Sequence, residues 1–456
     1  MENIILQIIK KYFNFSSNMN FSGMIKMLHQ NSDNFFSEIL MVVMEEIDNG
    51  IKTSKERKRN WNIIRIDTRT IRTVLGKVIF KRTYYQNKNT KRYAYLLDEA
   101  IGLKPYQRLD NAIEGKILEF ANHLSFKNTG KFVSDHDTFS KQTVKNIIQK
   151  FSKKEDEKYE DLEIKRVVKN LYIEADEDHV ALQKCNKNNV LNKIIYVHEG
   201  KVTECKNRKF LLNKKIFASN LKSTDDLWIQ VYDYIHSSYD TTKIENIFIL
   251  GDGAQWIKTG LEWITDATYV LDEFHLNKAI SVVSGGKRNK ETYDKLKELV
   301  YSGNKIEFLK EAKLLIEKET LESSIKRKTQ HMKYVKNQWK GIEANLEHKK
   351  KHQLGCSAEG HVSHILASRM SSRPQGWSRE GLEGITKLRV AISNGATRED
   401  LIAILKKINK KIYLEKNYKV KHIKRIKKAA METLGNIPVL SAGKVNGLQC
   451  MMSGLR

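Results

Sequence analysis

The pattern of apolar and polar positions changes in the first part of the chain. Residues 1–57 carry apolar side chains at helical spacing, which predicts two or three amphipathic helices. From Trp61 the apolar residues alternate with basic ones on both sides of Gly76, so residues 58–105 are predicted to form a strand, a turn and a second strand. The basic face of this small β element either lies on DNA phosphates or stays solvated.

Residues 106–160 return to helical spacing and predict a helix-turn-helix, two short helices joined by a tight polar turn. Ser140 can cap the second helix, whose apolar residues point inward. Its outward residues can read base edges in the major groove. These candidates are Lys141, Gln142, Lys145, Asn146 and Gln149. The alternative is an ordinary helical hairpin with a polar surface.

Charged residues 152–166 indicate a solvated helix or a linker, with a domain boundary near residue 160. The next segment, Leu171–Gln183, is apolar and strand-forming but has carboxylates in its middle. Burying Asp176 there is unfavourable unless a cation is its partner, and a divalent metal is the commonest partner of clustered carboxylates. The alternative is that Asp176 only opens a hairpin turn. Two later carboxylates, Asp252 at the end of a buried strand and Glu359 at the start of a helix, favour the metal site.

The elements predicted for residues 161–280 follow one another in the order β-β-β-α-β-α-β. The three opening strands are placed around Asp176, at residues 179–183 and at residues 192–200, joined as an antiparallel meander. This is the element order of the ribonuclease-H-like fold, a mixed α/β architecture. In that fold the first and fourth strands are neighbours, so Asp176 and Asp252 are expected side by side.

The rest of the chain is predicted to contain an insertion, the end of the core and a basic tail. Residues 281–350 read as an inserted domain of three charged helices, and residues 351–400 return to the core with the helix that begins beside Glu359. A loop rich in Arg and Trp follows, with Arg369, Arg373 and Trp377 as candidate DNA contacts. Residues 401–456 carry 13 Lys and Arg against 2 acidic residues, which suits a phosphate backbone or a solvated helix.

The composition indicates the class of binding partner and the cellular location. Lys and Arg number 81 against 54 acidic residues, and the net charge of +27 favours a polyanion, with nucleic acid ahead of a ribosomal or membrane surface. The four cysteines form no CxxC pair, which argues against a zinc ribbon and a disulfide scaffold. No stretch of 18 apolar residues predicts a membrane span or an export signal, so we expect a cytoplasmic, nucleoid-associated protein.

Four motifs, taken in order, resemble those of the DDE transposases of bacterial insertion sequences, and most closely the Lre-type insertion-sequence family. The motifs are Tyr172-Ile-Glu-Ala-Asp176, Leu250-Gly-Asp252-Gly-Ala-Gln-Trp-Ile, Leu271-Asp-Glu-Phe-His275-Leu-Asn-Lys and Ser357-Ala-Glu359-Gly-His, followed by the segment from Arg369 to Trp377. Each motif is weak alone, but their combination is specific and spans most of the chain.

The resemblance implies a ribonuclease-H-like catalytic core with a helical insertion before the last carboxylate. It also implies cleavage and strand transfer of double-stranded DNA, at the terminal inverted repeats of an element and in a target, by a homodimer or higher oligomer. Three carboxylates would hold two Mg²⁺ or Mn²⁺ ions about 3.5 to 4 Å apart. Asp176 would bridge both ions, while Asp252 and Glu359 would each hold one.

Several residues remain as alternatives. Asp178 and Asp272 are reserve ligands, and His275 either positions a phosphate or fills a helix start. Glu380 and Glu383 compete with Glu359 for the third position. Glu359 is preferred because related transposases have a small residue, Glu and then Gly or Asn at the start of the last core helix. The rival functions are a ribonuclease-H-type nuclease that cleaves without joining and a DNA-binding transposase relic without catalysis.

Overall fold

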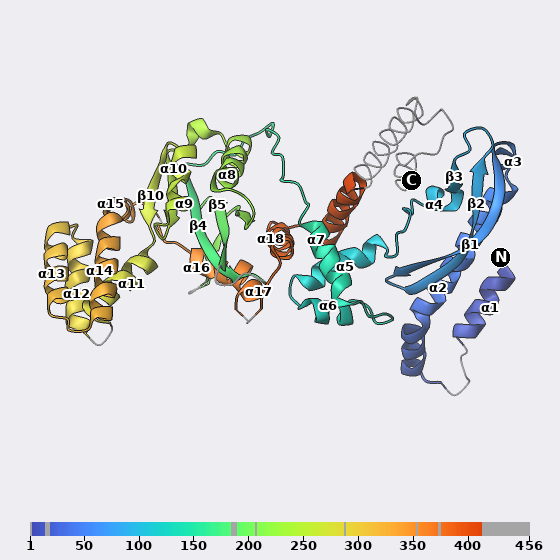
Figure 1. Ribbon diagram of the computed structural model, residues 1–456, viewed down its shortest axis with the longest axis horizontal. Helices are drawn as coiled ribbons and strands as arrows, with labels where there is room; N and C mark the ends of the chain where they lie inside the picture. The colour runs from blue at the N-terminus through green and yellow to red at the C-terminus, as the bar shows by residue number, and fades with distance from the viewer. Residues whose placement is uncertain are drawn as a thin grey trace, which may run out of the picture.

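The computed structural model describes residues 2–13, 19–183, 189–205, 208–286, 289–352, 354–372 and 375–412, and at positions 2, 3, 203–205, 208, 209, 358 and 359 it describes the backbone alone. Figure 1 shows an elongated molecule with the N-terminal element at one end, a group of short helices in the middle, a sheet beyond them and a helical bundle at the other end. Most of the predicted basic tail, from residue 413 on, lies outside the described residues, as does Arg373.

The N-terminal element is a twisted antiparallel sheet packed on one long helix. Its helices are α1 (Glu2–Tyr12), α2 (Phe21–Thr53), α3 (Lys55–Asn60) and α4 (Leu96–Ala100), and its strands are β1 (Trp61–Thr73), β2 (Gly76–Asn87) and β3 (Tyr93–Tyr95). The predicted strand, turn and strand around Gly76 are confirmed, and Gly76 has the positive φ of +99° that this turn requires. Buried Asp48 of α2 fastens the helix to β2 by accepting from Thr83 N and Oγ1 at 3.1 and 2.6 Å.

Three short helices, α5 (Asn111–Ala121), α6 (Phe126–Phe132) and α7 (Lys141–Phe151), follow. The predicted cap is confirmed, because Ser140 accepts from Thr143 N at the start of α7. The apolar residues of α7 are buried as predicted: Val144, Ile147, Ile148 and Phe151. Residues 133–140, which join α6 to α7, form a longer loop than the expected tight turn and bury Val133 and Phe139 in the core.

The central part is a mixed α/β unit built on five strands. They are β4 (Asn170–Ala181), β5 (Asn189–His198), β8 (Lys215–Ser219), β9 (Asn246–Gly251) and β10 (Ala267–Leu271), in the spatial order β10-β9-β4-β5-β8. β9 and β10 run parallel to β4, whereas β5 runs antiparallel to both β4 and β8. The separate strand expected at residues 179–183 is wrong, because β4 continues to Ala181. The third strand of the meander is β8, reached after a small hairpin of β6 (Lys201–Cys205) and β7 (Arg208–Leu211).

Strand alternation sends neighbouring residues of β4 to opposite faces of the sheet. Leu171, Ile173 and Ala175 pack in a core with Trp228 of α8 (Thr224–Ser238) and with Ile257 of α9 (Gln255–Lys258), beside α10 (Gly260–Trp263). The other face, which carries Glu174, Asp176 and Asp178, is covered by the returning C-terminal helices. These are α16 (Ala358–His361), the π-helical turn η2 (Val362–Ala367), α17 (Ser368–Met370) and α18 (Arg379–Ser393). The carboxylates therefore face these helices and not the apolar core of α8.

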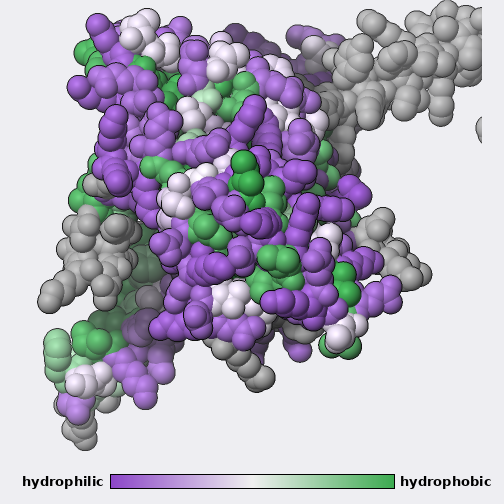
Figure 2. All heavy atoms as spheres, turned by 90° about the vertical axis from the view of Figure 1, so that its left-hand side faces the viewer, coloured by the Kyte–Doolittle hydropathy of each residue, from purple (hydrophilic) through white to green (hydrophobic). Residues whose placement is uncertain are grey.

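A helical bundle separates β10 from α16. It comprises α11 (Glu273–Ser284), α12 (Lys290–Tyr301), α13 (Lys305–Glu317), α14 (Glu322–Asn337) and α15 (Trp339–His348), so α12–α15 are four helices where three were expected. Its core includes Val283, Phe308, Val335 and Trp339. The face of this bundle in Figure 2 is mostly hydrophilic, with small scattered apolar patches. Within the ranges given above, no helix is both long and apolar enough to span a bilayer.

Candidate active site

Two adjacent parallel strands bring Asp176 and Asp252 together. The pairing between β4 and β9 ends at Glu174 opposite Leu250. Asp176 lies two residues after Glu174, and Asp252 lies two residues after Leu250. Asp176 is still inside β4, where it pairs with Ile194 of β5, so it does not open a hairpin turn. The carboxylates are close enough for the charge of Asp252 to raise the pKa of Asp176.

The charge on Asp176 has little compensation from the surrounding protein. Burial, followed by repulsion from Asp252, raises the pKa of Asp176 to about 6, although Glu177 N donates to Oδ1 at 2.8 Å and His275 favours the ionised form. Two neighbouring half-buried carboxylates fit a cation between them, because a cation favours the charged form of a carboxylate. Among the side chains that the structure describes, no group of three or more His, Cys, Asp or Glu is arranged to hold a metal ion.

A third aspartate orients a histidine beside this pair. Asp272 caps α11 by accepting from Phe274 N at 3.3 Å, and its other oxygen lies 2.9 Å from His275 Nδ1. This hydrogen bond raises the pKa of His275, and the negative charges of Asp252 and Asp176 act in the same direction. Asp272 is therefore engaged with the helix and the imidazole, and His275 is held in the wall of the site.

A pocket of about 330 Å³ opens next to Asp252. It is lined by Asp252, His275, Lys278, Gln330, His331 and Tyr334. Three of these residues come from α14, so the helical bundle forms one wall of the candidate site. Cationic and amide side chains opposite a carboxylate suit a phosphate that approaches a carboxylate-bound cation.

The helical bundle also fixes the backbone that carries Asp252. Tyr334 donates its hydroxyl to the Asp252 carbonyl at 2.5 Å, and Gln338 Nε2 donates to the Gly253 carbonyl at 3.1 Å. Gly253 has a φ of +95°, and a Cβ at this position would lie 2.3 Å from Gln338 Nε2. Glycine is thus required for the tight turn that follows Asp252.

Glu359 lies in α16, the short helix that contacts β4 on the face carrying Asp176. Its side chain is outside the part of the chain that the structure describes. The π-helical turn η2 follows it directly and buries Val362, Ile365 and Leu366. These three side chains share a core with Val180 and Ile194 of the sheet, so they hold this helix against the sheet.

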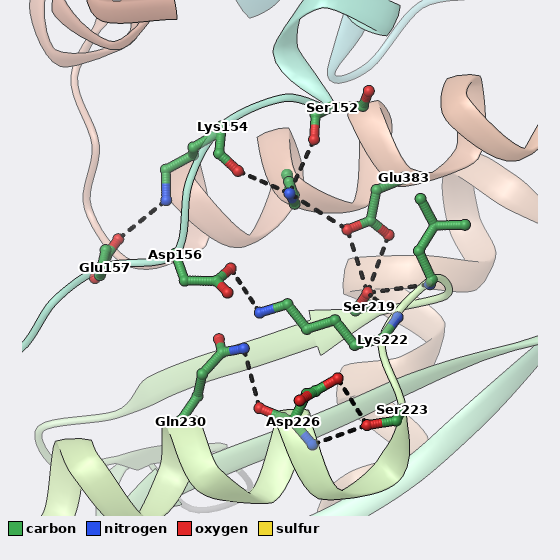
Figure 3. A network of polar contacts seen from close by, with 12 residues as sticks. Ser152, Lys154, Asp156, Glu157, Ser219, Lys222, Ser223, Asp226, Gln230 and Glu383 are labelled. Atoms are coloured by element: carbon green, nitrogen blue, oxygen red, sulfur yellow. Dashed lines mark hydrogen bonds and ion pairs between the residues drawn. The ribbon is translucent and has the colours of Figure 1, made fainter.

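Glu383, one of the two competing glutamates, has a structural partner elsewhere. Figure 3 shows it pointing at Ser219 and the turn after β8, the edge strand that lies two strands from β4. Its carboxylate is only 1% exposed and accepts from Ser219 Oγ at 3.2 Å and from Asn220 N at 3.1 Å. Glu380 lies one turn earlier on α18 and is exposed. The helix of Glu359 contacts β4, the strand of Asp176, whereas the carboxylate of Glu383 is engaged at the end of β8.

Asp178, the remaining reserve ligand, faces the same side of β4 as Asp176 but accepts from Ser371 Oγ at 2.8 Å. It is 8% exposed, and burial raises its pKa. Its contact fastens the segment after α17 to the sheet, so we assign Asp178 a structural role.

Two of the expected DNA contacts are buried instead. Arg369 is 7% exposed and donates to the carbonyls of Ala121 and Leu124 at 3.2 and 2.9 Å. Trp377 is 5% exposed, and its Nε1 donates to the Met370 carbonyl at 3.0 Å. Both pack with Phe126 of α6, so this contact joins the mixed α/β unit to the short helices before it. A packing role therefore replaces the predicted DNA contact for Arg369 and Trp377.

Only some of the residues of α7 that were predicted to contact DNA are exposed. Lys141, Gln142 and Asn146 are exposed, and Gln142 Nε2 donates to Asn146 Oδ1 at 2.7 Å. Lys145 and Gln149 are half-buried. The exposed set is thus smaller than the sequence suggested and lies in the first half of the helix.

Sequence reasoning overlooked Glu174. It is 1% exposed and lies two residues before Asp176 on the same strand face. Burial opposes its ionisation, but the hydrogen bond with His198 and the charge of Lys201 outweigh burial and hold its pKa at about 2. The signal was available, because alternation along Glu174, Asp176 and Asp178 places three carboxylates on one face.

These features define a class: an α/β protein with two half-buried aspartates at neighbouring parallel strands and a helical insertion that walls the site. The chain belongs to the uncharacterised protein family UPF0236, whose sequence pattern matches residues 15–407. A UPF0236 protein of Caldanaerobacter subterraneus subsp. tengcongensis is 35% identical over 441 residues, covering 96% of this chain and 93% of the relative. A second from that organism, also 35% identical, covers 96% of this chain and 92% of the relative over 448 residues, and its name joins eleven numbered designations. A UPF0236 protein of Streptococcus gallolyticus is 25% identical over 382 residues, which is 79% of this chain and 80% of the relative.

Proposed function

We propose that this protein is the DDE transposase of a bacterial insertion sequence, with a ribonuclease-H-like core. The observation that carries the proposal is the pair Asp176 and Asp252 on neighbouring parallel strands. Numbered along the core, the strand order is 5-4-1-2-3, with the second strand antiparallel to the first. A helical insertion between the last strand and the helix of Glu359 agrees with the order of elements in these transposases.

The family relatives add an independent argument. One name joins eleven numbered designations from one organism, and another joins four. Repeated copies of one gene within a genome are the expected trace of an element that moves. We take this as support for transposition over a nuclease with a single cellular task.

The proposed chemistry is an in-line displacement at phosphorus. Asp176, Asp252 and Glu359 would hold two Mg²⁺ or Mn²⁺ ions, which when bound activate the attacking oxygen and stabilise the leaving oxygen. In cleavage a water attacks a phosphodiester and the DNA 3′-oxygen leaves. In strand transfer that 3′-hydroxyl attacks a target phosphodiester and a new 3′-oxygen leaves. His275, oriented by Asp272, and Lys278 would position a phosphate in the pocket beside Asp252.

Incubating purified protein, Mg²⁺, labelled element-end DNA and a circular target tests this function. The element ends come from inverted repeats in the DNA that flanks the gene. We expect nicked ends and products in which the labelled end is joined to the target. Cleavage without joining would favour the ribonuclease-H-type nuclease, and specific binding without cleavage would favour the catalytically inactive relic. The presence of both aspartates argues against the relic.

Changing Lys141, Gln142 and Asn146 together to Ala is expected to weaken end-specific binding about tenfold or more, because these exposed side chains of α7 would contact bases and phosphates. A gel shift at physiological salt measures the change. Lys313→Ala on α13 removes the same single positive charge from another exposed helix and should leave binding nearly unchanged. Equal binding by the triple variant and the wild-type protein would refute the role of α7.

A further inference from the structure

The segment that leads into α16 is fastened to β4 by a single buried carboxylate. Glu174 Oε2 accepts from Ser357 N at 2.6 Å and from Ser357 Oγ at 2.8 Å, and Cys356 Sγ lies 3.6 Å from the same oxygen. Ser357 immediately precedes α16, and its carbonyl accepts from His361 N at 3.1 Å. The carboxylate therefore contacts the first turn of the helix that carries Glu359.

The second oxygen of Glu174 is held from the opposite side. Oε1 lies 3.1 Å from His198 Nε2 and 2.9 Å from Lys201 Nζ. Lys201 also donates to the carbonyl of Gly355, so it contacts both the carboxylate and the incoming segment. Partners on β5, on β6 and before α16 thus converge on one side chain of β4. Such a charge-assisted network restrains its members because His198, Lys201 and Ser357 each make a further polar contact.

We propose that Glu174 is a positioning residue that sets the start of α16, and with it the backbone of Glu359, against the strand that carries Asp176. This inference rests on the proposed function, in which Glu359 completes the metal site. The geometry explains why a carboxylate is placed two residues from Asp176 on the same strand face. Both carboxylate oxygens of Glu174 are already engaged by hydrogen-bond donors. Glu174 therefore acts through the position of α16 and is not itself a metal ligand.

The sheet provides a matched control at its far edge. Glu383 is as buried as Glu174, at 1% exposure, and also accepts from a serine hydroxyl, that of Ser219. Ser357→Ala and Ser219→Ala each delete one hydroxyl that donates to a buried carboxylate of the same core. A loss of stability is expected from both substitutions. Only Ser357→Ala is expected to loosen the helix that carries Glu359.

The test measures Mn²⁺ binding to the full chain by the electron paramagnetic resonance signal of free Mn²⁺, with thermal unfolding alongside. We expect Ser357→Ala to weaken Mn²⁺ binding about tenfold, as the loss of residues that orient metal ligands does. Hydrogen exchange of the peptide over residues 354–361 should become faster, because the backbone at position 357 is no longer restrained by the hydrogen bond from the serine hydroxyl to Glu174. Ser219→Ala should bind Mn²⁺ as the wild-type protein does, and Glu174→Gln should exceed the effect of Ser357→Ala if it folds.

Wild-type Mn²⁺ affinity in Ser357→Ala would overturn the positioning role of Glu174 and leave the proposed function standing. Equal weakening in Ser357→Ala and Ser219→Ala would also overturn it, because a general loss of stability would then explain the result. A wild-type protein that binds no Mn²⁺ would refute the proposed function itself, and the inference with it.

Discussion

Asp176→Asn is expected to abolish Mg²⁺-dependent cleavage of element-end DNA, a loss of about 1,000-fold or more, while making the metal-free protein more stable. Cleavage is lost because this residue would contact both ions, whose stabilisation of the transition state amounts to several kcal/mol. Binding of element-end DNA should persist, since the exposed side chains of α7 are unchanged. Asp252→Asn should lose cleavage in the same way.

The gain in stability follows from the pKa of Asp176. Its folded value of about 6 exceeds the ordinary 3.8, so the folded state binds this proton more tightly than the unfolded state. The stability that protonated Asp176 contributes to the folded state is present below pH 4 and is lost as the pH rises through about 6. Asparagine cannot ionise, so the variant should be more stable than the wild-type protein by about 2 kcal/mol at pH 8 in EDTA, and by much less at pH 4.

Thermal or denaturant unfolding in EDTA at both pH values measures this difference. Asp266→Asn provides the control, because Asp266 is exposed before β10, at the opposite end of that strand from the site. A variant Asp176→Asn that cleaves like the wild-type protein would remove this residue from the proposed triad. If Asp176→Asn and the wild-type protein were equally stable at both pH values, burial and the charge of Asp252 would not raise the pKa of Asp176.

Glu359→Gln is expected to lose cleavage to the same extent, about 1,000-fold, because it would remove the third ligand from the two-ion site. Glu380→Gln should retain full activity, since this side chain is exposed at the start of α18. Cleavage of labelled element-end DNA over a range of Mg²⁺ concentrations distinguishes the three glutamates.

Glu383→Gln is expected to behave differently from both. Its carboxylate holds the end of β8 through Ser219 and Asn220, so the variant should unfold more easily by about 1 to 3 kcal/mol. The Mg²⁺ concentration for half-maximal cleavage should stay that of the wild-type protein. Full activity in Glu359→Gln, with loss in Glu380→Gln or Glu383→Gln, would show that a different helix supplies the ligand.

The location of the helical insertion relates it directly to the proposed chemistry. Tyr334 and Gln338 hold the carbonyls of Asp252 and Gly253, and α14 lines the pocket beside them. The insertion is therefore more than a peripheral domain, because it fixes the turn that orients a candidate ligand. It also supplies polar side chains where the phosphate backbone of a substrate would pass.

Local features of the sequence determined a large part of this structure. The change from helical to strand spacing near Trp61, the turn at Gly76 and the cap at Ser140 depend on neighbouring residues, and all are present. The approach of Asp176 and Asp252 was also predictable, because it follows from the order of the strands. Alternation along β4 even marked the face on which Glu174 lies, although the residue itself was overlooked.

Only the tertiary structure decided the roles that depend on partners distant in the chain. Glu174 and Ser357 are 183 positions apart, and Glu383 meets Ser219 across 164 positions. Spacing cannot reveal whether an arginine near a glycine–tryptophan pair faces solvent or packs on Phe126, as Arg369 does. Such contacts form when separate elements pack together. A polar side chain that is buried among protein partners in this way is no longer free to bind a ligand.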